Sequence, residues 1–480
     1  MLQRIAHIQT HRWLSYITLI FAIILRIICY LYNRSLFLDE ALLAINMIEK
    51  DWYGILGVLD LNQSAPPGFL LVSKFFIETS GTHEYVLRFF PFVLGILSCI
   101  LMFQLVQKIN PRLTPIMMIW FATADILIRF GTEFKQYSGD LFLTLLLLII
   151  AVHLLQKATL RYIIYWAFAS IIAVWFSHAS VFAIAGFGFT IMLVLFRKRQ
   201  WKFLVWFMIA CGSALLSFAV AYLSFYHSTD SNTNLSTALE LFWVNDFFRP
   251  NWRWGLRLPV IFFSHISGIR RYPLILLTMF GFIAGLWNTP KRYLILFLSP
   301  VPVMLLASYL NYYPIFQRFL LFSLPLIMFI IAFGWLDVYD KLAAQGKHLQ
   351  HITFIFICIM FISGLDIRQE TTQLRQTLTI IQDISVNEPE IYVSPRVQYV
   401  TDYYQYSIPV HIRSIEFDTI PVSDTPIWLI VDELESGIHE SLSNTTGREP
   451  DFNPPGLIVY CIDGNEQICP AGENFSNRTR

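Results

Sequence analysis

The sequence predicts an α-helical membrane protein with several transmembrane helices, followed by a small soluble α/β domain. Hydrophobic residues make up 56% of the 480 residues and charged residues only 14%, well below the roughly 25% that is usual in soluble domains. The mean hydropathy is +0.55, and several apolar runs reach the about 20 residues that a helix needs to cross a membrane. Beyond Leu365 the composition becomes that of a soluble protein.

Helices, rather than a β-barrel, are expected in the membrane. Only helices and closed barrels satisfy their own backbone hydrogen bonds in lipid. The continuously apolar run Leu141–Ala151 excludes the alternating pattern of barrel strands. The formal net charge of +1 gives no basic face for nucleic acid, which is therefore not an expected partner.

The first span is expected over about Trp13 to Tyr32, behind a short amino terminus that carries Arg4 and Arg12. Because positive residues stay on the cytoplasmic side, the amino terminus should lie inside and the residues after Tyr32 outside. The run has no small-residue cleavage site, so we interpret it as a retained anchor and not as a signal peptide.

Two shorter segments follow within residues 41–77, and both are interrupted by polar residues. Residues 41–50 and 67–77 are too broken to span a bilayer and are better interpreted as helices lying in the membrane interface. The stretch Asn62–Gly68, with two prolines and a glycine, should separate them.

The later apolar runs bring the expected total to about eleven spans, an odd number that fits an inside amino terminus and an outside carboxyl terminus. The clearest cytoplasmic marker is the basic cluster Arg197–Arg199 with Lys202. A long outer loop is expected over residues 227–271. The remaining spans are expected over residues 85–107, from about 113, 137–155, 162–176, 180–196, 203–226, 273–287, 293–310, 319–335 and 352–365.

We therefore divide the chain into a membrane domain, residues 1–365, and an extracytoplasmic α/β domain, residues 366–480. Residues 390–393 and 426–431 have the composition of buried strands, and residues 399–406 can form a helix between them. Cys461 and Cys469 flank a short polar segment. They either close a disulfide loop in an oxidising compartment or remain reduced, since two cysteines make no framework.

Asp39 and Glu40 follow the first span directly, where the chain emerges into water. A carboxylate that borders a cavity can accept a proton from an attacking hydroxyl, so Asp39 is a candidate general base. The alternative is a solvated loop acid or the N-cap of a helix that begins near Ala41. Glu40 either binds the acceptor or raises the proton affinity of Asp39 by repulsion. Neighbours on a helix point in different directions, which favours one catalyst and one binding residue.

A second polar group opens the span at Tyr137, where Glu133, Lys135 and Tyr137 lie within five residues. Lys135 and the later Arg318 are candidate ligands for a phosphate, because a charge-assisted contact strengthens as the leaving group gains charge. Ordinary interface anchoring by lysine and tyrosine is the alternative. A histidine between two spans, such as His178, is more often hydrogen-bonded in a core or interface than bound to a metal. No HxxxH spacing supports zinc. The sequence requires no cofactor, and it neither demands nor excludes a divalent metal.

Several motifs, taken in order, resemble the membrane glycosyltransferases of the GT-C fold. The similarity is to the glycosyltransferase family 39-like group of protein O-mannosyltransferases and aminoarabinose transferases, and it covers about residues 20 to 340. The similar elements are Arg26 with Ser35-Leu36-Phe37-Leu38-Asp39-Glu40-Ala41, the proline-containing Gln63–Leu70, the arginine-led Leu87–Gly95, Glu133-Phe134-Lys135-Gln136-Tyr137, the turn Ser177-His178, and Tyr313–Phe319.

The resemblance implies roles for individual residues. Asp39 would be the general base of an inverting transfer and Glu40 a residue of the acceptor site. Lys135 and Arg318 would contact the phosphate of a polyprenyl-phosphate sugar. The other motif residues expected to bind substrate are Arg88, Glu133, Tyr137 and His178.

The chain departs from the family pattern at four positions. Lys135 and Gln136 stand where Arg-Pro is commoner, Ala179 replaces an aromatic residue, and Phe37 replaces a usual tryptophan. Lysine contacts a phosphate through a single charged ammonium, whereas arginine can donate two parallel hydrogen bonds from its planar guanidinium. The departures leave the reaction class in place and the identity of donor and acceptor open.

The predicted function is therefore transfer of one sugar, with inversion, from a polyprenyl-phosphate carrier to a lipid, glycan or protein acceptor outside a bacterial plasma membrane. A transporter or lipid-linked sugar flippase is the alternative. It would place charges near span centres in duplicated halves, whereas here they cluster at outer span ends and no repeat is present. A third hypothesis is an assembly protein that uses residues 366–480 for docking.

Overall fold

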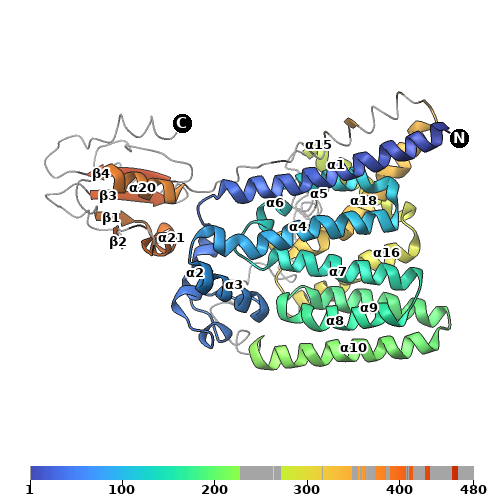
Figure 1. Ribbon diagram of the computed structural model, residues 1–480, viewed down its shortest axis with the longest axis horizontal. Helices are drawn as coiled ribbons and strands as arrows, with labels where there is room; N and C mark the ends of the chain where they lie inside the picture. Colours follow the sequence, from blue (N-terminus) through green and yellow to red (C-terminus); the bar gives the residue numbers. More distant parts are fainter. Residues whose placement is uncertain are drawn as a thin grey trace, which may run out of the picture. The chain divides into compact units, whose positions relative to one another are not determined.

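The computed structural model is mostly helical, with one small sheet near the carboxyl terminus (Figure 1). It describes residues 2–226, 272–315, 317–346, 373–384, 390–406, 410–414, 427–432 and 457–462, with a few single residues between them. The chain forms two compact units. The first holds Met1–Leu31, Trp52–Gly81 and Tyr85–Ile367, and the second holds Tyr32–Asp51, Thr82–Glu84 and Arg368–Arg480. The second unit thus takes in the Asp39 loop as well as the carboxyl-terminal part.

The first unit is a bundle of long apolar helices, and the protein is an integral membrane protein. Within the described residues, seven helices are long and apolar enough to cross a membrane, or eight if one bent pair is a single span. The expected span over residues 352–365 and the expected loop over residues 227–271 lie outside the described residues, so the total of about eleven stays a prediction. The main helices of this unit are α1 (Leu2–Tyr32), α4 (Glu84–Ile109), α7 (Tyr137–Gln156), α8 (Leu160–Phe176), α9 (Ser180–Arg197), α10 (Trp201–Ala221), α15 (Tyr272–Asn288), α16 (Lys291–Leu298), α17 (Pro300–Tyr309) and α18 (Leu324–Ala343). Of these, α16 and α17 together make one of the seven spans, and α8 and α15 are shorter apolar helices that are not counted among the seven.

Three expected elements have a different form in the structure. The span from about residue 113 is broken: after the short turn η2 (Pro111–Leu113), α5 (Thr114–Thr123) and α6 (Asp125–Gly131) meet at 59°. The span over 293–310 is divided at Pro300, since proline has no N–H to continue a helix and suits the first turn of a new one. The last described span opens with the turn η5 (Gln317–Ser323) before α18.

The two short helices expected before the second span are present as α2 (Leu38–Glu49) and α3 (Pro67–Ser80), with a 3₁₀ turn η1 (Gly54–Leu56) between them. Pro67 occupies the first turn of α3, which explains why the helix starts there. α3 packs against α8 in the first unit, whereas α2 belongs to the second unit.

Glycines allow a close helix contact in the first unit, between α15 and α18. A Cβ atom on Gly285 would overlap the Ile330 carbonyl, and one on Gly334 would overlap the Gly281 carbonyl. Small residues at such a crossing let the two helix backbones approach closely. The van der Waals contacts that result stabilise the packing of membrane helices.

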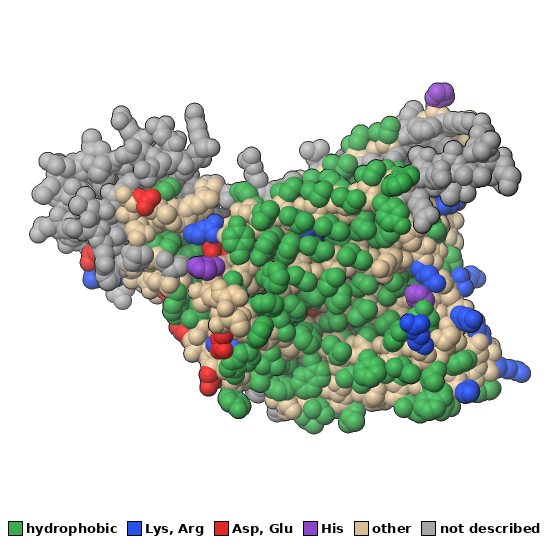
Figure 2. All heavy atoms as spheres, viewed as in Figure 1, with side chains coloured by type: hydrophobic (Ala, Val, Ile, Leu, Met, Phe, Trp, Pro, Cys, Tyr) green, Lys and Arg blue, Asp and Glu red, His purple; other side chains and the backbone are tan. Residues whose placement is uncertain are grey.

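One end of the helix bundle carries the basic turns. The side-chain amide of Gln156 donates to Lys108 O (3.3 Å) and to the Tyr293 hydroxyl (3.0 Å), and Lys198 Nζ donates to Leu155 O (3.2 Å). Arg112 pairs with Asp340. Figure 2 shows lysine and arginine side chains gathered at this end, while apolar side chains cover the flank of the helices.

The second unit contains a four-stranded sheet of order β2-β1-β3-β4. β1 (Glu390–Val393) is parallel to β2 (His411–Ser414) and to β3 (Ile427–Asp432), and β4 (Leu457–Ile462) pairs antiparallel with β3. Strands β1 and β3 and helix α21 (Pro395–Gln405) were expected from the sequence, whereas β2, β4 and helix α20 (Leu374–Ile384) were not. Cys469 and its pairing lie outside the described residues.

Candidate functional site

The acidic pair lies at the start of α2, in the second unit. Phe37 is the N-cap, so the alternative of Asp39 as N-cap is wrong, and both acids occupy the first turn, where the helix dipole favours negative charge. Glu40 is fully buried and its Oε2 accepts from the Phe37 amide (3.0 Å) and from Arg34 Nη1 (2.9 Å). Asp39 is half-buried. These contacts of Glu40 hold the first turn of α2 in place. The two acids therefore differ, because Glu40 is fully buried and Asp39 only half-buried.

In the first unit, Lys135 is buried, and its ammonium donates to Gln63 Oε1 at 2.5 Å. Gln63 belongs to the proline-containing motif, so the fold joins two motifs that are 72 residues apart. A small pocket of about 20 Å³ lies beside Gln63 and has room for about one water molecule. Glu133 is also buried, and its Oε2 lies 3.6 Å from Arg129 Nε.

Tyr137 joins the same region to the late motif. Its ring packs on Phe130 and on Phe319, with centroids 5.1 Å and 6.0 Å away. The half-buried Arg318 lies over the Phe319 ring, 5.6 Å from its centroid. The Tyr313 hydroxyl donates to Phe319 O at 2.9 Å. The structure thus brings together the motifs at residues 133–137 and 313–319.

The turn with His178 is attached to the same helix end through Asp140. The Asp140 carboxyl faces the Ser177 hydroxyl and the Ala179 amide. Ser177 Oγ accepts in turn from the Ser180 amide (3.0 Å) at the start of α9. Burial lowers the pKa of His178 from 6.5 to about 4, so its imidazole is neutral near pH 7.

Asp140 is not among the site residues predicted from the sequence. It is buried in α7, and burial together with the charge of Asp140 raises the pKa of Tyr313 well above its usual value. The available signal was a carboxylate within an apolar span, which is by default a functional candidate. Asp140 ties the His178 turn to the helix that begins with Tyr137.

Arg88 is buried in α4, one turn before Phe92, whose ring stacks on Tyr30 of α1 with centroids 4.1 Å apart. It therefore lies at the contact of α4 with α1. Among the described residues, no group of three His, Cys, Asp or Glu side chains has the arrangement of a metal site.

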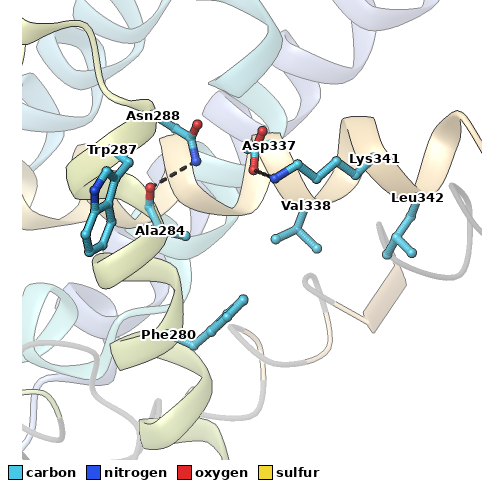
Figure 3. Close-up of a pocket in the computed structure, with 8 residues that line it drawn as sticks. All are labelled: Phe280, Ala284, Trp287, Asn288, Asp337, Val338, Lys341 and Leu342. Carbon is cyan, nitrogen blue, oxygen red and sulfur yellow. Dashed lines mark hydrogen bonds and ion pairs between the residues drawn. The ribbon is translucent and has the colours of Figure 1, made fainter.

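The larger described pocket, about 440 Å³, lies elsewhere, between α15 and α18 (Figure 3). Figure 3 shows Trp287 and Asn288 on one wall, and Lys341 on the other, where its Nζ pairs with Asp337 Oδ2 at 2.7 Å. These residues lie near the carboxyl end of α18, whereas Arg318 lies just before its amino end. The pocket is therefore at the opposite end of that span from the motif residues.

No protein-family model matches the chain, and no curated protein sequence matches it. Among solved structures, ArnT from Cupriavidus metallidurans in the apo state is similar, with 10% sequence identity, a TM-score of 0.53, and coverage of 93% of this chain and 98% of that one. The same protein bound to undecaprenyl phosphate gives 10% identity and a TM-score of 0.49, over 92% of this chain and 97% of that one. The first similarity shows that the chain has this fold along nearly its whole length. The GT-C fold expected from the order of the motifs is thus confirmed.

Proposed function

From this shared fold, we propose that the protein is an inverting glycosyltransferase that moves a sugar from a polyprenyl-phosphate carrier to an acceptor on the outer face of a bacterial plasma membrane. The observation that carries the proposal is the meeting of three motifs at one end of the helix bundle. Residues 133–140, 177–180 and 313–319 are joined there by the contacts of Tyr137, Asp140 and Phe319.

The basic turns support the proposed orientation. Lys108, Lys198 and Arg112 lie at the opposite end of the same helices. Lysine and arginine are retained on the cytoplasmic side of bacterial membranes. This distribution supports a motif end outside the membrane, with a cytoplasmic amino terminus and an extracytoplasmic carboxyl terminus.

In the proposed reaction, the acceptor hydroxyl attacks the anomeric carbon of the donor sugar from the face opposite the phosphate. A C–O bond to the acceptor forms as the bond to the phosphate oxygen breaks, which inverts the configuration. Asp39 accepts the hydroxyl proton as the attack proceeds. Polyprenyl phosphate leaves with the bonding electron pair.

The proposed donor contacts are Lys135 and Arg318. Cations held in a water-poor setting stabilise the charge that develops on a departing phosphate. Lys135 is buried with its ammonium on a neutral amide oxygen, Gln63 Oε1. This bond fixes the position of a buried cation, which supports a role for Lys135 in binding an anion.

The substitution Asp39→Asn tests the proposal. In proteoliposomes supplied with radiolabelled polyprenyl-phosphate sugars and candidate acceptors, turnover should fall by about 10²- to 10⁴-fold, the usual contribution of a general base. Donor affinity should stay unchanged, because Asp39 acts on the acceptor. The matched control is Asp51→Asn, an exposed acid of the same unit, which should keep full turnover. Full turnover in Asp39→Asn would contradict the mechanism.

A further inference from the structure

The loop before α2 is held by the carboxyl-terminal part of the chain, within the second unit. Arg375 of α20 makes two contacts with this loop and a third with Glu84. Its guanidinium donates to Asn33 O at 2.7 Å and to Glu84 Oε1 at 2.8 Å, and its backbone amide donates to Ser35 Oγ at 3.3 Å. One arginine therefore fixes both the backbone and a side chain of the loop that leads to Asp39.

A tyrosine of α21 fixes the next residue. The Tyr404 hydroxyl accepts from the Leu36 amide at 2.9 Å, and both residues are buried. A buried amide without an acceptor costs about 1–3 kcal/mol, so this contact holds the loop in one conformation. α2 itself packs along α21, and the Tyr406 hydroxyl donates to Glu49 Oε1 (3.0 Å) at the far end of α2.

The loop is fixed from its own side as well. Asn33 has a φ of 44°, a left-handed conformation that asparagine tolerates better than most residues. Arg34 and Phe37 are both bound to Glu40, at 2.9 Å and 3.0 Å. Between Asn33 and Phe37, each residue thus has a described contact that holds it in place.

We propose that Arg375 and Tyr404 are positioning residues for Asp39, an inference that rests on the proposed function. They hold the backbone from which the first turn of α2 projects the carboxylate. A catalytic group must be kept within about 0.5 Å of its productive place by such supporting contacts. The carboxyl-terminal α/β part is then a component of the catalytic machinery, and not a separable docking module.

Arg375→Ala and Tyr404→Phe in the full-length protein test the inference. A displacement of about 1 Å can cost on the order of 10²-fold in rate. We expect kcat to fall by about 10- to 100-fold in each variant, while the KM for the polyprenyl-phosphate sugar stays unchanged. Arg375→Lys, which keeps one cationic donor, should recover part of the rate.

Matched controls come from the same unit. Arg413→Ala removes an exposed arginine of β2, and Tyr399→Phe removes the hydroxyl of an exposed tyrosine of α21. Neither residue contacts the loop in the described structure, and both variants should keep the kcat of the parent. If Arg375→Ala fails to fold, Tyr404→Phe still tests the positioning role, because this variant removes only one oxygen atom.

Hydrogen exchange separates this inference from the proposed function. Amides of residues 33–40 should exchange faster in Arg375→Ala and Tyr404→Phe than in Arg413→Ala, whatever the substrate is. Unchanged exchange together with unchanged kcat would overturn the positioning role. Full turnover in Asp39→Asn would overturn the proposed function instead, with the exchange result still standing.

Discussion

His178 lies in the three-residue turn between α8 and α9, next to Ser177, whose hydroxyl faces Asp140. Burial lowers its pKa from 6.5 to about 4. A neutral imidazole retains one donor and one acceptor nitrogen, so near pH 7 this residue is suited to bind a neutral hydroxyl and not an anion. The phosphate contacts of the proposed reaction therefore fall to Lys135 and Arg318.

The lowered pKa predicts a loss of stability on acidification. Between pH 6.5 and about 4 the unfolded chain binds a proton at His178 that the folded protein does not bind, so stability falls as the pH falls. It is fully present above about pH 6.5, and the loss amounts to at most about 3 kcal/mol. Melting in detergent between pH 7.5 and 4.5 should show a smaller decrease for His178→Gln than for the parent.

The control for this prediction is His83→Gln, because the His83 side chain is exposed to solvent. Its melting curve should follow the parent at every pH. If His178→Gln also follows the parent, the imidazole is not held neutral by burial.

For individual residues of the candidate site, the sequence predicted some features and not others. It placed Asp39 and Glu40 together and indicated that they differ, because neighbouring residues on a helix diverge. It did not predict that Glu40 pairs with Arg34, six residues away, because this pair depends on how the loop before α2 folds. Nor did it predict that Lys135 meets Gln63, because that contact forms only when two distant segments of the chain pack. Periodicity and motif spacing carry no information on such contacts.

Among the elements, the break between α5 and α6 has a partner in α1. The guanidinium of Arg26 is almost completely buried and donates to Phe121 O at 2.6 Å and to Ala122 O at 2.9 Å. These carbonyls belong to the last turn of α5, where the helix leaves them without intrahelical donors. A cation is favoured at this end of a helix, and Arg26 therefore stabilises the break.

Removing this cap should loosen the break. In Arg26→Met the two carbonyls lose a charged donor in an apolar setting, which costs about 1–3 kcal/mol for each. Cys99 reports on the change, because its thiol is fully buried and lies near Arg26. Peptide-resolved maleimide labelling should modify Cys99 several-fold faster in Arg26→Met than in the parent.

The matched control is Arg161→Met, an exposed arginine at the start of α8, which should leave the labelling of Cys99 unchanged. Equal labelling in Arg26→Met and Arg161→Met would show that the break does not depend on Arg26.

Most elements of the membrane unit could be predicted because long apolar runs fix where a helix crosses lipid. The first span ends at Tyr32 as expected, and its helix α1 begins earlier, at Leu2. The break at Ala124 could not be predicted, since no proline or glycine marks it and its stabilising group lies on another helix. In the second unit, β2 was missed because the short segment His411–Ser414 has only one apolar residue.

For the whole molecule, composition predicted a membrane part, residues 1–365, followed by a soluble part, residues 366–480; this division stays a prediction, while the chain forms two compact units with other boundaries. Composition did not predict that Tyr32–Asp51 would join the second unit. That assignment depends on hydrogen bonds of Arg375 and Tyr404 across more than 300 residues of sequence. No local pattern in the loop anticipates them.

The apolar flank of the helix bundle exposes large hydrophobic side chains, such as Phe168, Leu215 and Leu216, at 64%, 68% and 68%. Such a surface is suited to lipid, and a carrier lipid can approach the protein only from the bilayer. If the proposed donor is correct, a polyprenyl phosphate should co-purify with the full-length protein and be identified by native mass spectrometry after gentle delipidation.

The charge of the motif end should decide which lipid is retained. Lys135→Ala removes the buried ammonium, so the amount of co-purified polyprenyl phosphate should fall by about 10-fold, as expected for the loss of one charge-assisted contact of about 1.5 kcal/mol. Lys157→Ala removes an exposed lysine after α7 and should retain as much of the lipid as the parent. Equal retention of polyprenyl phosphate in both variants would contradict the proposed donor. Recovery of phospholipids alone would contradict it as well, because a transporter of other solutes does not need to bind a polyprenyl phosphate.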